Sequence, residues 1–218
     1  MTKREERAVT IALAADGSAL EGLYIAGRDD EAVAVVVAAP HPLYGGSMET
    51  PVVNEIAYAA REAGLASLRF NWRGVGASAG RPSGDAEDAV ADYRAALDYL
   101  LATVPGPVCA AGYSFGAACA VRMAAAEPWI RRLLLVAPPP AFLDRDALVA
   151  FGGAVTVIVG SEDSLAPASA LAAMVETLPR GRFHEIAGAD HFFGIGLAEI
   201  GRISREVLSA GTDSVGER

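Results

Sequence analysis

The chain has few of the residues from which disulfide frameworks, metal sites and membrane spans are built. It contains two cysteines, Cys109 and Cys119, which form no disulfide framework and lack the spacing of metal ligands. No apolar run approaches the roughly 18 residues needed to cross a bilayer. We therefore expect neither a membrane span nor a metal site, and we interpret both thiols as small buried hydrophobic groups.

Basic residues are also few: the chain has 18 Lys and Arg residues and 27 Asp and Glu residues, which gives a net charge of −9. An acidic surface repels phosphate backbones, which disfavours nucleic acid as a partner. The first seven residues are mostly charged and lead into a strand-like segment, unlike the apolar core of a secretion signal. We expect a cytoplasmic protein that binds neither nucleic acid nor membrane and is a monomer or a homodimer.

Apolar segments, by contrast, are abundant: 52% of the 218 residues are hydrophobic, enough for a large core. A helix begins at the Thr50–Pro51 pair, which suits a cap and a first helical position, and it ends at Gly64. Further helices are predicted at residues 85–103, 117–126, 167–178 and 197–208. Strand patterns occur at residues 8–14, 20–26, 32–39, 66–70, 107–111, 132–137, 154–160 and 183–187.

This alternation predicts an α/β fold, with a mostly parallel sheet of about eight strands and helices on both faces. Because the sequence has no internal repeat and no linker, we interpret residues 1–208 as one domain and residues 209–218 as a flexible tail. Sites in such sheets lie beyond the carboxyl ends of the strands. Candidate functional residues are therefore expected in the loops that follow the strands.

The most informative motif is the pentapeptide from Gly112 to Gly116, which reads Gly-Tyr-Ser-Phe-Gly. It lies between a predicted strand and an alanine-rich helix, where a Gly-x-Ser-x-Gly sequence forms a sharp turn with the serine at its apex. The two glycines are expected because a Cβ there would collide with the neighbouring strand and helix. Ser114 is therefore the candidate nucleophile.

Ser78 lies in a second match to the same pattern, Gly-Ala-Ser-Ala-Gly at residues 76–80. This match falls in a long glycine-rich loop, and no helix begins directly after it. Context therefore favours Ser114 and indicates that Ser78 is a structural loop serine.

A serine nucleophile needs a base, and the chain has only three histidines: His41, His184 and His191. His191 follows the last predicted strand, in a loop that can carry its imidazole over the serine. His184 lies within a strand pattern, and His41 lies in the loop after the third strand, where we expect a structural role. His191 is the candidate base.

The base in turn needs an orienting acid between the serine and the histidine in the sequence. Asp163 follows the predicted strand 154–160 and is the candidate. Glu162 beside it is the competing choice, and Asp144 and Asp146 after the preceding strand are weaker ones.

A negative oxygen formed during acyl transfer needs two backbone N–H donors. Phe115, directly after the serine, is expected to supply one of them. The loop after the third strand, residues 40–48, should supply the other, and Leu43 is favoured, with Tyr44 as second choice, because the prolines cannot donate.

At this point the chain resembles the α/β-hydrolase superfamily, and most closely its small dienelactone-hydrolase-like and prolyl-oligopeptidase-like esterase branch. The resemblance extends over residues 32–208, and its motifs are residues 41–46, 68–78, 112–116 and the segments around Asp163 and His191. It implies an α/β-hydrolase fold with catalytic roles for Ser114, Asp163 and His191. It also implies that the loop containing Ser78 is structural.

Only residues 138–153 separate the sixth and seventh predicted strands, so we expect an open site without the large helical lid of many family members. Arg73 could bind a substrate carboxylate, but a loop-bracing role is favoured. Aromatic side chains on the loops could form an apolar pocket, although several of them could instead be core residues. These are Tyr44, Trp72, Tyr113, Phe115, Phe142, Phe151, Phe192 and Phe193.

The leading hypothesis is a serine hydrolase that cleaves small carboxylic esters without any metal or organic cofactor. A thioesterase, acyltransferase or peptidase with the same three residues is the enzymatic alternative. A non-catalytic binding protein on a hydrolase scaffold is the alternative from another class.

Overall fold

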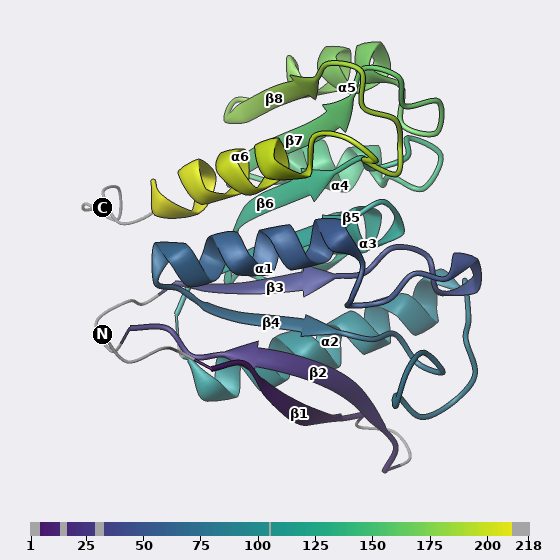
Figure 1. Ribbon diagram of the computed structural model, residues 1–218, viewed down its shortest axis with the longest axis vertical. Helices are drawn as coiled ribbons and strands as arrows, with labels where there is room; N and C mark the ends of the chain where they lie inside the picture. Colours follow the sequence, from purple (N-terminus) through teal and green to yellow (C-terminus); the bar gives the residue numbers. More distant parts are fainter. Residues whose placement is uncertain (1–4, 14–16, 29–32, 105, 211–218) are drawn as a thin grey trace.

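An eight-stranded sheet forms the centre of the computed structural model, which describes residues 5–13, 17–28, 33–104 and 106–210 (Figure 1). The strands lie in the order β1-β2-β4-β3-β5-β6-β7-β8. β1 and β2 form an antiparallel hairpin, β2 pairs antiparallel with β4, and all remaining pairs are parallel. The strands are β1 Arg7–Ala12, β2 Ala19–Ile25, β3 Ala34–Ala38, β4 Ala66–Phe70, β5 Val108–Tyr113, β6 Ile130–Val136, β7 Ala154–Gly160 and β8 Gly181–Ile186.

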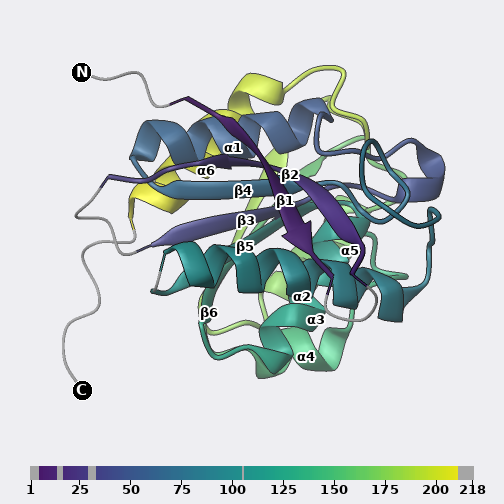
Figure 2. The same ribbon diagram turned by 90° about the horizontal axis from the view of Figure 1, so that it is seen from below.

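Helices cover both faces of the sheet. In Figures 1 and 2, α1 and α6 lie together on one face, and α2, α3 and α4 lie on the other. The central strands β3, β4 and β5 are buried along their whole length. β3 is the continuous apolar run expected of such a strand, whereas β4 also buries Ser67 and Arg69. The helices are α1 Pro51–Ala63, α2 Ala86–Thr103, α3 Phe115–Ala126, α4 Arg145–Ala150, α5 Ala168–Val175 and α6 Leu197–Ser209, with a short 3₁₀ turn η1 at Pro42–Tyr44.

The helix ends follow local sequence signals. Asp85 caps α2, where its carboxylate accepts hydrogen bonds from the backbone N–H groups of Glu87 and Asp88 at 2.7 and 3.2 Å. Gly64 ends α1 with a φ of 87°, a conformation that favours glycine. Thr50 differs from expectation, because its hydroxyl accepts from Ser47 N at 3.4 Å and makes no capping bond to α1.

The sheet order changes direction between β3 and β5. The chain runs from β3 outward to β4 on one side, and from β5 outward through β6, β7 and β8 on the other. At such a switch point the loops leaving the two central strands diverge and leave a crevice at their carboxyl ends. Ser114, directly after β5, lies beside this point.

The predicted architecture is confirmed, with strand boundaries that shift by a few residues. β5 extends to Tyr113, two residues further than predicted, so the strand leads directly into Ser114. Between β6 and β7 the chain forms only the six-residue helix α4, as expected for a fold without a large lid. Ala32 at the start of a predicted strand, Asp16 of the first turn and residues 211–218 of the predicted tail lie outside the described residues.

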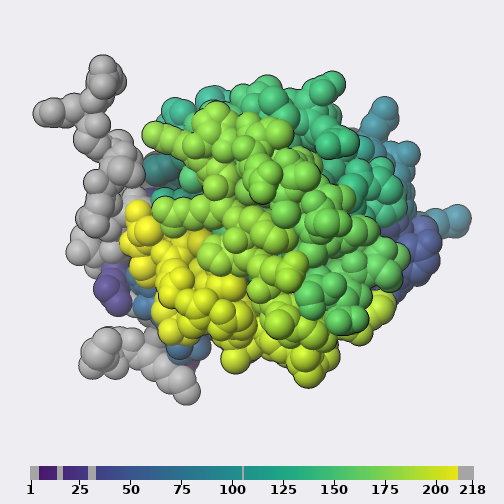
Figure 3. All heavy atoms as spheres, turned by 90° about the horizontal axis from the view of Figure 1, so that it is seen from above, coloured from purple at the N-terminus to yellow at the C-terminus, as the bar shows by residue number. Residues whose placement is uncertain are grey.

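The final third of the chain forms the surface at the β8 edge, coloured green to yellow in Figure 3. This part of the chain includes the loops after β7 and β8, in which Asp163 and His191 lie. In the described part of the chain, no helix is both long enough and apolar enough to cross a membrane.

Candidate active site

Ser114 is held at the apex of a strained turn between β5 and α3. Its φ of 55° and ψ of −117° are unusual for a residue with a side chain, and such strain costs roughly 1–3 kcal/mol. Its backbone N–H donates to Val136 O at 2.8 Å, which ties the turn to the end of β6.

The flanking glycines have the steric role that the motif predicts. A Cβ on Gly112 would lie less than 3.0 Å from the backbone of Gly116, and a Cβ on Gly116 would lie equally close to the carbonyl oxygen of Ala38. The turn therefore packs against β3 with no room for either side chain.

Three of the predicted site residues are joined by hydrogen bonds. Ser114 Oγ lies 3.0 Å from His191 Nε2, and His191 Nδ1 lies 2.8 Å from Asp163 Oδ2. They come from the loops after β5, β7 and β8, so the sheet brings together residues that are 28 and 77 positions apart. Glu162, the competing acid, has an exposed side chain, whereas Asp163 is buried.

The contacts of Asp163 determine which nitrogen of His191 carries the proton. Asp163 Oδ1 accepts from the backbone N–H groups of Leu165 and Ala166 at 2.9 and 2.7 Å, which fixes the carboxylate. Because a carboxylate only accepts, Nδ1 of His191 must be the donor in the His191–Asp163 bond. Nε2 then presents its lone pair to Ser114, as a general base requires.

The loop that carries His191 is anchored on both sides. Tyr113 donates its hydroxyl to the backbone carbonyl oxygen of His191 at 2.6 Å. Asp190 accepts from Phe192 N at 3.0 Å, and Phe193 adopts a positive φ of 51° with its side chain buried. The imidazole is therefore held in place by the fold.

The predicted second oxyanion donor requires a correction. Leu43 N donates to His41 Nδ1 at 3.2 Å, and Tyr44 N donates to His41 O at 3.1 Å, so both amides have partners within their own loop. Burial lowers the pKa of His41 and thus favours the neutral ring that can accept this bond. Phe115 is the first residue of α3, a position whose N–H has no acceptor within the helix, so it fits the predicted donor.

The predicted pocket residues separate into exposed and buried groups. Tyr44, Phe142 and Phe192 are exposed by 86%, 46% and 75%, and they lie on loops after β3, β6 and β8. Trp72 and Tyr113 are exposed by only 1% and 4%, and they belong to the core. The expectation that these last two line a pocket is therefore wrong, because they offer no surface to a substrate.

Two further aromatic residues named from the sequence also lie away from an open pocket. Phe193 is buried in the core. Phe151 lines a cavity of about 850 Å³ at the opposite edge of the sheet, where β5, β6 and β7 begin. The remaining residue, Phe115, is largely buried beneath His41, with ring centroids 4.6 Å apart.

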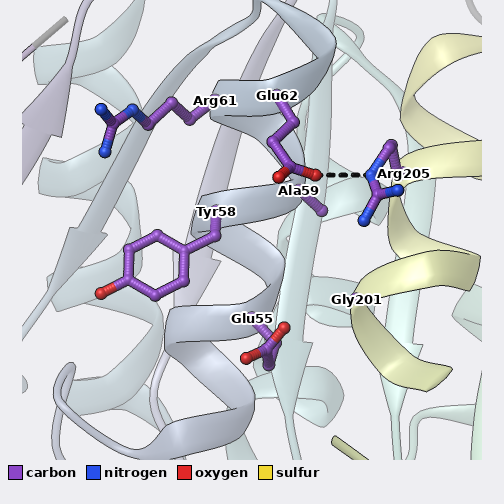
Figure 4. A pocket seen from close by; sticks show the side chains of 7 residues that line it. All are labelled: Glu55, Tyr58, Ala59, Arg61, Glu62, Gly201 and Arg205. Carbon is purple, nitrogen blue, oxygen red and sulfur yellow. Dashed lines mark ion pairs between the residues drawn. The ribbon is translucent and has the colours of Figure 1, made fainter. Parts of the chain in front are cut away.

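Another hollow, of about 520 Å³, lies between α1 and α6 (Figure 4). Glu62 and Arg205 form an ion pair of 2.6 Å across it. Its seven lining residues include no serine, cysteine or histidine, so it offers no nucleophile or imidazole base. They are Glu55, Tyr58, Ala59, Arg61, Glu62, Gly201 and Arg205.

Ser78 and Arg73 have the structural contacts that the sequence predicts. Ser78 Oγ accepts from Glu21 N and donates to Asn71 O, both at 2.9 Å, which joins its loop to β2. The guanidinium of Arg73 contacts Asp92 at 2.7 Å and also pairs with Asp88. Neither residue is directed at Ser114 by these bonds.

Cys109 and Cys119 are both buried and free, as expected. Burial raises the pKa of each thiol to about 12. Among the described residues, no group of three or more His, Cys, Asp and Glu side chains is arranged to hold a metal ion.

Comparison with known proteins agrees with this fold. Residues 30–151 match the family described as serine aminopeptidase, S33. An uncharacterized protein of Rickettsia prowazekii is 30% identical over 205 residues, which cover 87% of this chain and 84% of the relative.

Two solved structures share the fold over nearly their whole length. A protein of unknown function from Agrobacterium tumefaciens, described as a putative α/β hydrolase, superposes with a TM-score of 0.86 at 28% identity, covering 97% of this chain and 100% of that one. An α/β serine hydrolase without a lid from Xanthomonas campestris superposes with a TM-score of 0.80 at 29% identity, covering 94% of each chain.

The fold and these matches define the class: the chain is an α/β hydrolase of the lidless kind. Within that class it belongs to the family described as serine aminopeptidase, S33.

Proposed function

We propose that this chain is a serine hydrolase that cleaves small carboxylic esters through an acyl-enzyme. The observation that supports the proposal most strongly is the chain of two hydrogen bonds from Ser114 Oγ through His191 to Asp163, at 3.0 and 2.8 Å. A serine hydroxyl is a weak nucleophile until a base within hydrogen-bond reach removes its proton.

In the first half-reaction, Ser114 Oγ attacks the ester carbonyl carbon while His191 Nε2 takes the hydroxyl proton. The carbonyl oxygen becomes negative and accepts from the N–H of Phe115, an interaction that typically lowers a barrier by about 3 kcal/mol. Asp163 stabilises the imidazolium that has formed. The imidazolium then gives its proton to the leaving alkoxide as the carbon–oxygen bond breaks.

In the second half-reaction, water replaces the alcohol. His191 takes a proton from the water, whose oxygen attacks the acyl carbon, and the proton passes to Ser114 Oγ as the acid leaves. One ester and one water thus give one acid and one alcohol, with the enzyme regenerated. The partner is a small-molecule ester, and the proposed compartment is the cytoplasm.

Hydrolysis of a short-chain p-nitrophenyl ester by three proteins tests this proposal. We expect Ser114→Ala to lower kcat by at least about 10³-fold, because the nucleophile is lost. Ser78→Ala should retain turnover per folded molecule, since Ser78 joins a loop to β2. Equal loss in both variants, or full activity of Ser114→Ala, would contradict the assignment.

Peptide-bond cleavage is the second candidate, and the description of the matched family as serine aminopeptidases favours it. The same three residues could open an amide, with His191 protonating the departing amine. Aminoacyl p-nitroanilides tested beside p-nitrophenyl esters discriminate the two activities: preferential turnover of the anilides would replace the ester proposal.

A further inference from the structure

Large exposed hydrophobic side chains are concentrated at one edge of the molecule. Of nine such side chains among the described residues, six lie on loops that follow the carboxyl ends of β3, β6, β7 and β8. Concentrations of exposed apolar surface mark interaction sites. The six are Leu43, Tyr44, Phe142, Leu165, Phe192 and Ile195.

Four rings of this edge form a continuous cluster beside Ser114, which we name the aromatic ledge: His41, Tyr44, Phe115 and Phe142. The ring of His41 lies 4.8 Å from Tyr44 and 4.6 Å from Phe115, and Phe142 lies 6.1 Å from Phe115 (centroid distances). Phe115 directly follows Ser114, so the ledge starts at the nucleophile and extends outward to the exposed rings of Tyr44 and Phe142.

The floor of the ledge is rigid. The buried indole of Trp72 packs edge-on against Phe115 at 5.7 Å, and its Nε1–H donates to Ala39 O and Pro40 O at 3.0 and 3.1 Å. Gly84 packs directly against the His41 ring, since a Cβ there would lie only 2.8 Å from its Cε1 and Nε2 atoms. The buried part of the ledge is therefore held in place before a substrate binds, which lowers the conformational cost of binding a rigid group there.

The sheet order indicates which part of an ester faces the ledge. The leaving oxygen must approach His191, because that imidazole protonates it. His191 and Asp163 follow β8 and β7, on one side of β5, whereas His41 and Tyr44 follow β3, on the other side. Phe142 follows β6, and its ring reaches this group through contacts of 6.4 Å with His41 and 6.1 Å with Phe115. The acid part of the substrate therefore points away from His191, toward the ledge.

We propose that the aromatic ledge binds an aromatic ring in the acid part of the substrate, so that the enzyme prefers aryl-substituted carboxylic esters, such as phenylpropanoates, over alkyl ones. Aromatic pairs gain roughly 0.5–1.5 kcal/mol beyond the area they bury, when their rings meet edge to face or offset. Because the site has no large lid, direct contact with these rings is the means of holding the group. This proposal rests on the proposed ester hydrolysis.

The test compares methyl 3-phenylpropanoate with methyl butanoate, measured by acid release, so that the only ring is in the acid part. We expect wild-type kcat/KM to be at least about 10-fold higher for the aryl ester, by the burial of one ring. Phe142→Ala and Tyr44→Ala should each reduce this aryl-to-alkyl ratio about 3-fold or more, mainly through KM. Both side chains are exposed, so their truncation leaves the core intact.

Tyr58→Ala and Trp129→Ala are the matched controls, because both remove exposed aromatic side chains far from the ledge, on α1 and directly before β6. They should keep the wild-type ratio. A wild-type ratio near one, or a ratio unchanged in both ledge variants, or an equal fall in the controls, would overturn the proposal.

Failure of the ledge and failure of the proposed function give different results. If methyl butanoate and the aryl ester are hydrolysed with equal kcat/KM and a fluorophosphonate labels Ser114, the proposed ester hydrolysis is supported and only the proposed role of the aromatic ledge is wrong. If neither ester is hydrolysed and Ser114 is not labelled, the proposed function fails, and the substrate preference built on it is overturned as well.

Discussion

The hydroxyl of Tyr113 donates a hydrogen bond of 2.6 Å to the backbone carbonyl oxygen of His191, a residue 78 positions away in the sequence. Tyr113 immediately precedes Ser114, and its ring lies 5.7 Å from the imidazole of His191. Burial raises the pKa of Tyr113, so its hydroxyl stays protonated and remains a donor. One side chain thus links the segment that carries the candidate nucleophile to the loop that carries the candidate base.

Removal of this hydroxyl should therefore affect the rate more than the binding of substrate. We expect Tyr113→Phe to lower kcat about 3- to 10-fold with little change in KM, because the loop that carries His191 loses the hydrogen bond from Tyr113. Loss of a donor to a buried carbonyl also costs about 1–3 kcal/mol of unfolding free energy. Steady-state kinetics and denaturant unfolding measure the two effects.

Tyr93→Phe is the matched control for this variant. Tyr93 is a buried tyrosine on α2, and its hydroxyl donates to the backbone oxygen of Ala111 at 3.3 Å. Ala111 lies in β5, so this bond does not involve the His191 loop. The Tyr93→Phe variant should be less stable than the wild type but should keep the wild-type kcat per folded molecule. If both variants lower kcat equally, the bond to His191 has no special role in positioning the base.

The position of Tyr113 illustrates what could not be derived from the sequence. The pentapeptide places Tyr113 beside the nucleophile, but the partner of its hydroxyl is a backbone atom on a loop after β8. No local pattern specifies such a contact, because it depends on how two distant loops pack. The sequence therefore predicts Tyr113 as a pocket residue, whereas its side chain is buried and hydrogen-bonded to the His191 backbone.

Gly116→Ala should destabilise the protein strongly. The added Cβ would lie less than 3.0 Å from the backbone oxygens of Ala38 and Ala39, so α3 and β3 would have to separate. Overpacking of this kind typically costs about 1–3 kcal/mol, and backbone neighbours adjust less easily than side chains. Thermal unfolding should show a clear drop in Tm.

Gly152→Ala provides the comparison, since a Cβ there meets nothing within 4 Å. Its Tm should stay close to that of the wild type. If Gly116→Ala were as stable as Gly152→Ala, the turn would tolerate a side chain at residue 116. That result would contradict the proposed clash between this Cβ and β3.

The ion pair between Arg73 and Asp92 should contribute to stability. Asp92 is buried, and its carboxylate accepts from Arg73 N at 2.8 Å and from the guanidinium at 3.0 and 2.7 Å. Asp92→Ala removes these three hydrogen bonds, while the guanidinium keeps its contacts with Asp88. Breaking a buried pair typically costs about 3–5 kcal/mol of unfolding free energy, and we expect less here because Arg73 is partly exposed.

Glu199→Ala removes a partner from an exposed ion pair with Arg202 on α6, so it should leave the stability almost unchanged. Denaturant unfolding of both variants tests the contrast. Equal denaturant midpoints for Asp92→Ala and Glu199→Ala would contradict the stabilising role assigned to the ion pair between Arg73 and Asp92.

Both cysteines should be inert in the native protein. Their thiol pKa values of about 12 lie above the usual value, and the thiolate is the reactive form, so almost none is present at pH 8. A thiol reagent such as 5,5′-dithiobis(2-nitrobenzoate) should react with neither thiol in native buffer and with both after denaturation. Rapid reaction of one thiol in the folded protein would contradict its burial.

The order of strands and helices could be predicted because strands such as β3 and β5 are continuous apolar runs, and because α1 ends at a glycine and α2 begins at a capping aspartate. Loop interiors could not. The prolines of residues 40–48 correctly excluded two amides, yet the sequence did not reveal that His41 accepts hydrogen bonds from both Leu43 and Tyr44. Such bonds depend on the 3₁₀ turn that the loop adopts at Pro42–Tyr44.

The central claim is that Ser114 is made nucleophilic by His191 in the folded protein. Labelling with a fluorophosphonate, followed by peptide mapping, tests it most directly. The account predicts one adduct, on Ser114, formed at least about 100-fold more slowly in His191→Ala. An adduct on Ser78 instead, or no adduct on Ser114 in the folded wild-type protein, would contradict it.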